Sequence, residues 1–213
     1  RDGDYALNDL AAVRATPFEV QRDFTGHTDR DIVSTTFLAS HTGPNLVLSN
    51  AMGFVNWKTF DATDLDYSVM PLATRDNQEE AKQFSDEIRI ASQPSFLIKL
   101  GGNRTFKWQA GTLFFTQNYD QTAVNTFAPF VVSEFVAVPV AQTSPQAALD
   151  DFGVGVYGQG TVSFGNRVDV SPGVRYDHQR RKANITTSFA PPIAPGTLVD
   201  ETRSFDDVSP QVA

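Results

Sequence analysis

The sequence predicts an all-β fold: an antiparallel transmembrane β-barrel of which these 213 residues form a part, about seven strands of a larger barrel. Three observations lead to this prediction. Apolar and polar residues alternate with a period of two in several segments, which gives a strand one apolar and one polar face. The clearest segments run for about a dozen residues, longer than the usual strand of a globular protein. Short and long connections alternate along the chain, as periplasmic turns and extracellular loops do in outer-membrane barrels.

Four strands are predicted in the first half of the chain. The first two, residues 30–41 and 44–60, alternate only weakly. The next two, FSDEIRIAS (84–92) and TFKWQAGTLFFTQ (105–117), alternate clearly. Their apolar side chains share one face: Phe84, Ile88, Ile90, Phe106, Trp108, Ala110 and Phe114. Because successive side chains of a strand point to opposite faces, the residues between them form a polar face.

The second half predicts a hairpin with arms 152–164 and 168–177 and a tight turn at Gly165-Asn166. Its apolar face carries Phe152, Val154, Val156, Val162, Phe164, Val168, Val170, Val174 and Tyr176. Pro172 has no backbone N–H to donate, so a bulge or a local break is expected there. A last strand is predicted over 203–213.

The connections between these strands are expected to differ between the two ends of the sheet. Short or moderate turns are predicted at 42–43, 93–104 and 165–166. Long polar extracellular loops are predicted at 61–83, 118–150 and 183–202. Weak helical periodicity occurs at 78–84 and 145–150. A soluble β-sandwich has no reason to place every long loop at one end, whereas an outer-membrane barrel does.

Composition excludes several classes of function. The net charge is −8, and an acidic protein repels a polyphosphate, so no nucleic-acid partner is expected. The chain has no Cys, which excludes disulfides, thiolate metal sites and thiol nucleophiles. No apolar run approaches the roughly 20 residues of a membrane-spanning helix, whereas a barrel strand is polar at alternate residues.

A glycine pattern in the hairpin imitates a nucleotide site. Gly153-x-Gly155-x-x-Gly158 has the spacing of a phosphate-binding loop, and Asp151-Phe152-Gly153 matches a kinase triplet. A dinucleotide fingerprint follows a buried strand and opens a helix, but PQAALDDF precedes the glycines and QGTVSFGNRV follows them. A kinase needs a Lys on the next strand, where Arg175 stands. The glycines are therefore expected to ease strand curvature and close approach.

Acidic residues crowd the expected loop 61–83: Asp61, Asp64, Asp66, Asp76, Glu79 and Glu80. They lack the Asp-x-Asp-x-Asp-Gly spacing of a calcium loop, so a solvated loop is expected. The chain also has no partnered nucleophile and base. No catalytic, cofactor-binding or metal-binding residue is predicted, and the protein is not expected to be an enzyme.

The polar faces of the strands supply the first set of candidate functional residues. If the apolar face meets lipid, the opposite face lines a watery lumen. The lumen-facing candidates are Glu87, Arg89, Lys107, Gln109, Tyr157, Gln159, Arg175 and Asp177. The alternative for any one of them is a salt bridge that only stiffens the wall.

Several segments resemble barrel strands of TonB-dependent outer-membrane receptors. FSDEIRIAS followed by TFKWQAGTLFFTQ resembles a strand pair of that family, and VYGQGTVSFGNRVDVSPGVRYD resembles a later hairpin. SFDDVSPQVA is similar to the strand that follows. The resemblance covers 82–213 well and 30–60 loosely, and it makes residues 1–213 part of the barrel domain. No plug domain, TonB box or terminal aromatic strand is recognisable, so the chain is expected to be a fragment.

The resemblance implies a function and partners. It implies a protein of the bacterial outer membrane, in contact with its lipid, that takes up a scarce ligand such as a ferric siderophore. The TonB complex would supply energy through the N-terminal region missing here, and a ferric chelate or other small ligand would bind the extracellular loops. In the loop 118–150, four aromatic residues suit a chelate or pack on one another: Tyr119, Phe127, Phe130 and Phe135.

Two alternatives remain open at this point. One is a passive porin-like or small structural outer-membrane barrel. The other is a soluble β-sandwich that acts as a binding module. A sandwich would bury in its core six residues that a barrel would expose on one continuous outer band: Phe106, Trp108, Val154, Val156, Val170 and Val174.

Overall fold

The computed structural model describes residues 10–17, 22–165 and 167–212, and these form one antiparallel sheet of nine strands and a short helix. Seven long strands follow one another across the sheet: β1 (His27–Thr42), β2 (Leu46–Asp64), β3 (Ala73–Ser92), β5 (Arg104–Phe127), β6 (Val140–Phe164), β8 (Pro172–Ala190) and β9 (Thr197–Val212). The short strands β4 (Ile98–Gly101) and β7 (Val168–Val170) pair with β5 and β6. The helix α1 (Leu10–Ala15) precedes the sheet.

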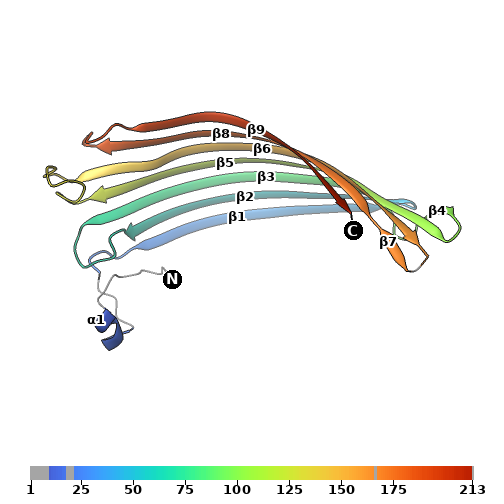
Figure 1. Cartoon of the computed structure of the whole chain (residues 1–213), viewed down its shortest axis with the longest axis horizontal. Coiled ribbons are helices and arrows are strands. Elements are labelled where there is room, and N and C mark those ends of the chain that lie inside the picture. Colours follow the sequence, from blue (N-terminus) through green and yellow to red (C-terminus); the bar gives the residue numbers. More distant parts are fainter. Residues whose placement is uncertain (1–9, 18–21, 166, 213) are drawn as a thin grey trace.

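The sheet is a curved wall that does not close (Figure 1). β1 and β9 are its two edges, and each long strand pairs with its neighbours in the chain. The prediction of an all-β antiparallel sheet with about seven long strands is confirmed. No helix in the described ranges is long and apolar enough to span a membrane.

One face of the sheet, the apolar face, carries the hydrophobic residues predicted from the alternation. Residues paired directly across two strands share a face. The pairing register therefore shows which residues of the seven long strands lie on the same face. The six residues of the predicted outer band all lie on this face, and Val156 and Val174 are 54% and 51% exposed. The described chain forms a single sheet with no second sheet packed against it, which contradicts the β-sandwich alternative.

The length of the apolar band suits a bilayer. On β6 the band runs from Phe152 to Phe164. Twelve residue steps cover about 40 Å along a strand, or about 29 Å when the strand is tilted by ~45°. The hydrocarbon core of a membrane is about 30 Å thick. The band is therefore long enough to cross one.

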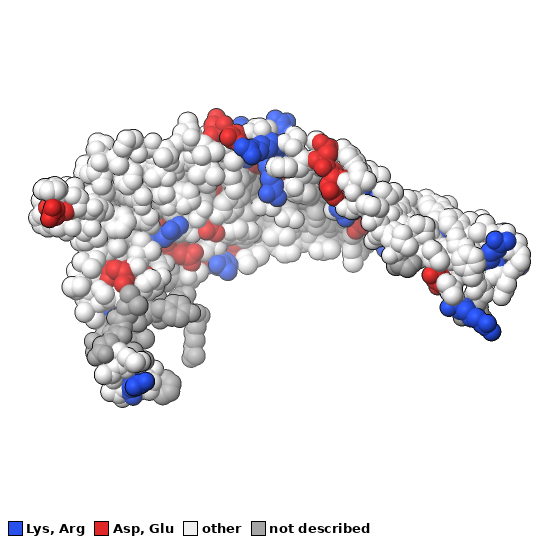
Figure 2. All heavy atoms as spheres, viewed as in Figure 1, with Lys and Arg blue, Asp and Glu red and all other residues white. Residues whose placement is uncertain are grey.

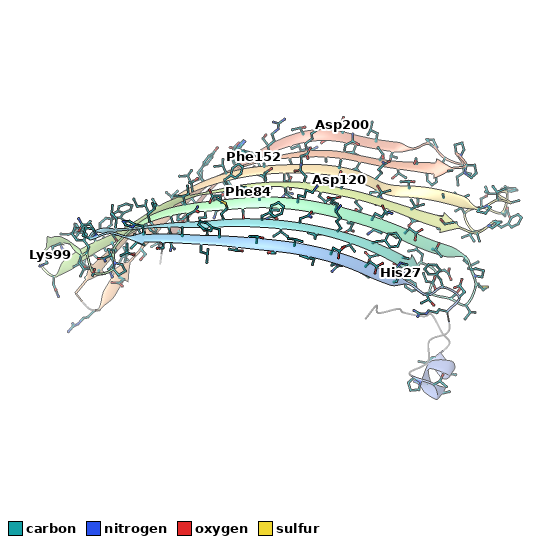
Figure 3. The ribbon with its side chains drawn as sticks, turned by 180° about the vertical axis from the view of Figure 1, so that it is seen from behind. His27, Phe84, Lys99, Asp120, Phe152 and Asp200 are labelled. Carbon is teal, nitrogen blue, oxygen red and sulfur yellow. The ribbon has the colours of Figure 1, made fainter. Side chains whose placement is uncertain are left out.

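Aromatic residues mark the loop-side edge of this band. We call them the aromatic girdle: Phe37, Phe54, Phe84, Phe114, Phe152 and Tyr176. The rings of Phe84 and Phe114 lie 6.1 Å apart, and those of Phe114 and Phe152 lie 5.5 Å apart edge to face. Figure 3 labels Phe84 and Phe152 over the middle of the sheet. Aromatic belts of this kind form at membrane interfaces.

The sheet has almost no hydrophobic core. Among the described residues the buried hydrophobic side chains are small: Ala62, Ala73, Ala81, Ala123, Val140 and Ala147. Large apolar side chains stay exposed because no second layer packs against them. The backbone ladder and contacts within each face therefore hold the wall together.

The strands extend far into the segments expected to be loops. The loops at this end are residues 65–72, 128–139 and 191–196, shorter than the predicted 61–83, 118–150 and 183–202. The weakly helical segments 78–84 and 145–150 are strand in β3 and β6, so the helical interpretation is wrong. Beyond the apolar band both faces are polar, so the period-two signal disappears although the hydrogen-bond ladder continues.

Prolines interrupt the strands at two places. At Pro172 the expected local break is present, since Ser171 separates β7 from β8. The register is unchanged across this break, and the hydroxyls of Thr161 and Ser171 lie 2.8 Å apart. A bulge not predicted from the sequence occurs at Ser144-Pro145, opposite Ala123 on β5. Pro cannot donate to a ladder, so a bulge accommodates it.

The turns at the other end are only partly as predicted. The turn at 42–43 is residues 43–45, and the connection 93–104 contains β4. Gly165 has φ 63°, which a tight turn requires. Its predicted companion Asn166 lies outside the described residues.

Candidate functional site

The face opposite the apolar band, the polar face, brings all eight predicted lumen-facing residues together. Two neighbouring rows across the sheet carry most of them. One row runs through Arg89, Gly111, Tyr157 and Arg175, and the next through Glu87, Leu113, Gly155 and Asp177. Lys107, Gln109 and Gln159 follow toward the turn end. In the view of Figure 2, acidic and basic side chains are intermingled along the upper edge of the sheet, where Figure 1 draws β8 and β9.

Tyr157 links three strands of this cluster. Its hydroxyl, on β6, donates a hydrogen bond of 2.6 Å to Oε1 of Glu87 on β3. To reach Glu87 the ring crosses β5 over Gly111, where a Cβ would lie 2.6 Å from the phenol. Glycine at this position is therefore what allows the Tyr157–Glu87 contact.

Arg175 and Asp177 form a bidentate ion pair on β8. Nε and Nη2 of Arg175 donate to the two carboxylate oxygens of Asp177, each at 2.7 Å. Gly155 makes room for this pair, because a Cβ there would lie 2.5 Å from Oδ1 of Asp177. The geometry is the stiffening salt bridge that the sequence left open for this pair.

Other members of the cluster keep free polar groups. Gln109 donates to Gln159 at 2.8 Å, which uses one amide N–H. Arg89 and Lys107 form no ion pair with any residue that the structure describes. A hollow of about 430 Å³ lies here, lined among others by Glu87, Tyr157, Gln159 and Arg175. A second hollow of about 360 Å³ adjoins Glu87 and Arg89. The arrangement can hydrogen-bond a polar solute and attract an anionic one.

The glycine pattern serves side-chain packing on a strand. At Gly153 the ring of Phe115 occupies the place of a Cβ, and at Gly155 the Asp177 carboxylate does so. Gly158 is open, with Gln109 O the nearest atom at 4.0 Å. All three glycines lie inside strand β6, whereas the glycines of a dinucleotide-binding loop lie between a strand and a helix. This arrangement supports the structural interpretation over the nucleotide-binding one.

A second polar-face cluster nearer the loops was missed by the sequence analysis. Trp57 and Tyr119 flank the buried Ala81, and their rings lie 6.0 Å apart. Gln121 donates to Asn77 at 2.8 Å, and Asn77 donates to Glu79 at 2.8 Å. Residues 117–125 (QNYDQTAVN) are largely polar on both faces, so the sequence carries no period-two signal that would have revealed this cluster.

The four predicted loop aromatics do not form one site. Tyr119 lies within β5 on the polar face, so its placement in a loop was wrong. Phe127 is the last residue of β5, about 27 Å farther along the strand. Phe130 and Phe135 do lie in the loop 128–139, where they are 60% and 86% exposed.

The acidic residues that were predicted to share one loop lie in different elements. Asp61 and Asp64 belong to β2, and Asp76, Glu79 and Glu80 to β3, which leaves Asp66 in the loop. Carboxylate oxygens of Asp23, Asp64 and Asp66 lie within 4.8 Å of one another. Asp64 accepts hydrogen bonds from the backbone N–H groups of Asp66 and Tyr67, both at 3.1 Å. These contacts hold the turn.

A larger hollow of about 730 Å³ lies toward the loops on β1, β2, β3 and β5. Charged residues line much of it: Asp29, Arg30, Asp31, Lys58, Glu79, Glu80 and Asp120. Lys58 and Lys82 both contact Glu80, at 3.2 and 2.9 Å. On the apolar side of the sheet the charges at this level are therefore partly paired with one another.

Comparisons with known proteins agree with this architecture. The family model described as TonB dependent receptor-like, β-barrel, matches residues 1–213. The crystal structure of the ferric yersiniabactin uptake receptor FyuA from Yersinia pestis is similar over 88% of this chain, with a TM-score of 0.64 and 12% identity. This chain covers 26% of that receptor. A search of curated proteins finds no match.

Proposed function

The chain belongs to the TonB-dependent receptor β-barrel family, and we propose that it forms part of the wall of an outer-membrane receptor for energised uptake of a scarce ligand, a ferric siderophore. Members of this family are outer-membrane transporters, not enzymes. The absence of a predicted catalytic site agrees with that membership. The similar structure from Yersinia pestis is described as a ferric yersiniabactin uptake receptor.

The observation that carries the proposal is the contrast between the two faces of one curved sheet. The apolar face exposes a band about 29 Å tall with aromatic residues at its edge. The polar face carries charged and amide groups around hollows. A wall with lipid on one side and a watery interior on the other needs both properties. The eight polar-face candidates, from Glu87 to Asp177, would then line the interior.

Within this interior the residues would divide into two roles. The Tyr157–Glu87 bond and the Arg175–Asp177 pair fix the shape of the wall, because their polar groups are used within it. Arg89 and Lys107 keep unpaired cationic groups that would attract an anionic chelate. At the loop end, Phe130 and Phe135 would offer exposed rings to a ligand arriving from outside.

Uptake measurements test the proposal. The intact protein would be expressed in cells that lack other ferric-chelate receptors, with and without a functional TonB. Uptake of radioactive iron from a panel of ferric siderophores should require both the protein and TonB. Uptake that persists without TonB would instead support the passive porin-like barrel, and no uptake of any chelate would exclude iron as the cargo.

A matched pair of variants tests the interior. Arg89→Gln should lower the uptake rate of an anionic ferric chelate, because a cation that faces the interior is lost. Lys82→Gln removes a cation from the opposite face, where Lys82 contacts Glu80 at 2.9 Å, and should leave uptake unchanged. Equal effects of both changes would mean that the polar face does not form the transport path.

A further inference from the structure

Basic side chains gather on the apolar face of β8, just beyond the aromatic girdle. After Tyr176, the next three outward positions on this strand are His178, Arg180 and Lys182. On the neighbouring strand β6, Phe152 ends the apolar run, and Arg180 pairs directly with it across the ladder. On β8, hydrophobic residues thus give way to cations at the level of Phe152, two outward positions beyond Tyr176.

The position of these cations corresponds to a headgroup layer. Alternate residues of a strand are about 6.8 Å apart. If Phe152 marks the edge of the hydrocarbon, Arg180, which pairs with it, lies at that edge and Lys182 one step beyond it. Arginine and lysine side chains can also extend further, with their aliphatic stems on apolar surface and their charge in the polar layer. The phosphates of lipid headgroups occupy this layer.

The charges of Arg180 and Lys182 are not neutralised within the protein. Neither residue forms an ion pair among the described residues, and both are exposed. Acids lie near them on the same face without contacting them: Asp200 is paired with Asn184, one outward position beyond Lys182, and Asp206 accepts a hydrogen bond from Tyr176 at 2.5 Å and contacts His178 at 2.9 Å. Asp150, opposite Lys182, accepts a hydrogen bond from Asn118 at 2.5 Å.

Other cations on the loop side of the apolar band do form ion pairs with acids. Lys58 and Lys82 lie at a comparable level on β2 and β3, and both contact the Glu80 carboxylate. Arg181 points to the polar face between Arg180 and Lys182, and it lies 3.5 Å from Asp151. On the loop side of the apolar band, the described outward-facing Lys and Arg side chains of the strands that lack an ion pair are therefore two, Arg180 and Lys182 on β8.

We propose that Arg180 and Lys182 form a binding site for the phosphate of an anionic lipid in the leaflet on the loop side. The Arg180 guanidinium can hold two phosphate oxygens at once, and Lys182 adds a second charge. The acyl chains would lie along the apolar band below, beside Val154, Val156 and Val174. The inference rests on the proposed membrane placement of the wall, and it is independent of which ligand is transported.

Lipid titration tests the site. The intact purified protein, in a zwitterionic detergent at low salt, would be titrated with phosphatidic acid, and bound lipid would be counted by native mass spectrometry. A basic residue near an anionic headgroup contributes about a fivefold change in affinity. Arg180→Gln with Lys182→Gln should therefore weaken binding about 25-fold, and each single change about fivefold.

Three variants serve as controls. Arg181→Gln and Lys82→Gln remove cations of the same region that are already paired, so they should leave the affinity within about twofold. The swap Arg180→Lys with Lys182→Arg keeps both charges and should retain most of the affinity. If the double Gln variant does not fold, as judged by its circular dichroism, the two single variants decide the question.

Several outcomes would overturn the proposal. They are equal affinity of the double Gln variant and the unchanged protein, equal binding of phosphatidylcholine, and displacement of the lipid by millimolar inorganic phosphate, which would indicate a site for a soluble anion. The uptake assay separates this inference from the proposed function. A failure to transport iron would not affect the proposed lipid site. Lipid binding that does not depend on Arg180 and Lys182 would not affect the proposed transport function.

Discussion

The two faces of the sheet are built from the same seven long strands, residue by alternate residue, yet they follow different chemistry. On the apolar face, large side chains such as Val156 and Val174 are about half exposed, and ring contacts join Phe84, Phe114 and Phe152. On the polar face, hydrogen bonds such as Tyr157–Glu87 join one strand to another. Neither face behaves like one half of a buried core, so the sheet separates two environments.

Each face also contains an exception, and the exceptions are informative. On the apolar face, Asn50 donates a hydrogen bond of 2.5 Å to Asp86 within the hydrophobic band. On the polar face, the ring of Phe115 lies over Gly153. A polar pair in the band must satisfy itself, because lipid offers it no partner.

The sharpest way to break the contrast is to place a charge in the apolar band. Val156→Arg should destabilise the protein in lipid by about 2–4 kcal/mol, because a guanidinium near the bilayer midplane loses its hydration. Gln159→Arg, on the polar face of the same strand, should cost less than about 1 kcal/mol. Unfolding in urea from lipid vesicles measures both. Equal costs would mean that the two faces meet the same solvent.

The next effect concerns the polar pair within the band. Asn50→Leu should cost about 1–3 kcal/mol, because it leaves the Asp86 carboxylate without its amide partner in an apolar setting. The double change Asn50→Leu and Asp86→Leu should recover most of that loss. A double-mutant cycle of unfolding free energies gives the coupling, and a coupling near zero would show that water reaches the pair.

An effect of similar size is expected on the polar face, where Tyr157 packs over a position that has no side chain. Gly111→Ala should cost about 1–3 kcal/mol, because the new Cβ would lie 2.6 Å from the Tyr157 ring and 2.9 Å from Ile88 O. Gly158→Ala is the matched control, since its nearest atom lies at 4.0 Å. Tyr157→Phe, which removes only the hydroxyl, should cost about 0.5–1.5 kcal/mol. Identical unfolding curves for Gly111→Ala and the unchanged protein would contradict the packing described for Tyr157.

The smallest effect concerns the loop 65–72, which connects β2 and β3. Burial tends to raise the pKa of the Asp66 carboxyl, but hydrogen bonds from Ser68 and from the backbone N–H of Ala73 lower it below its ordinary value of 3.8. Because the folded-state pKa is lowered, this contribution to stability is present above pH 3.8 and is lost as the pH falls through the lowered pKa.

The pH dependence of the unfolding free energy measures this contribution. Asp66→Asn should reduce the loss of stability below pH 3.8, since its amide does not titrate there. If the unfolding free energy of this variant fell below pH 3.8 as steeply as that of the unchanged protein, Asp66 would not stabilise the loop.

Much of the fold and part of the candidate site follow from local pattern. The alternation Phe152-Val154-Val156 against Gly153-Gly155-Tyr157 determines which side chains share a face, whatever strand lies beside them. The absence of Cys and of a nucleophile–base pair likewise removed whole classes of chemistry. The eight polar-face candidates came from this pattern, and the register brings them to one face.

The tertiary structure decided what depends on register. Tyr157 meets Glu87, 70 residues away in the chain, only because β5 places Gly111 between them. Tyr119 and Gln121 lie in a strand because β3 and β6 pair with both sides of β5, although their own sequence is polar on both faces. Hydrophobic alternation records which solvent each face meets, whereas the ladder that extends strands and aligns distant residues is made by backbone groups that every residue carries.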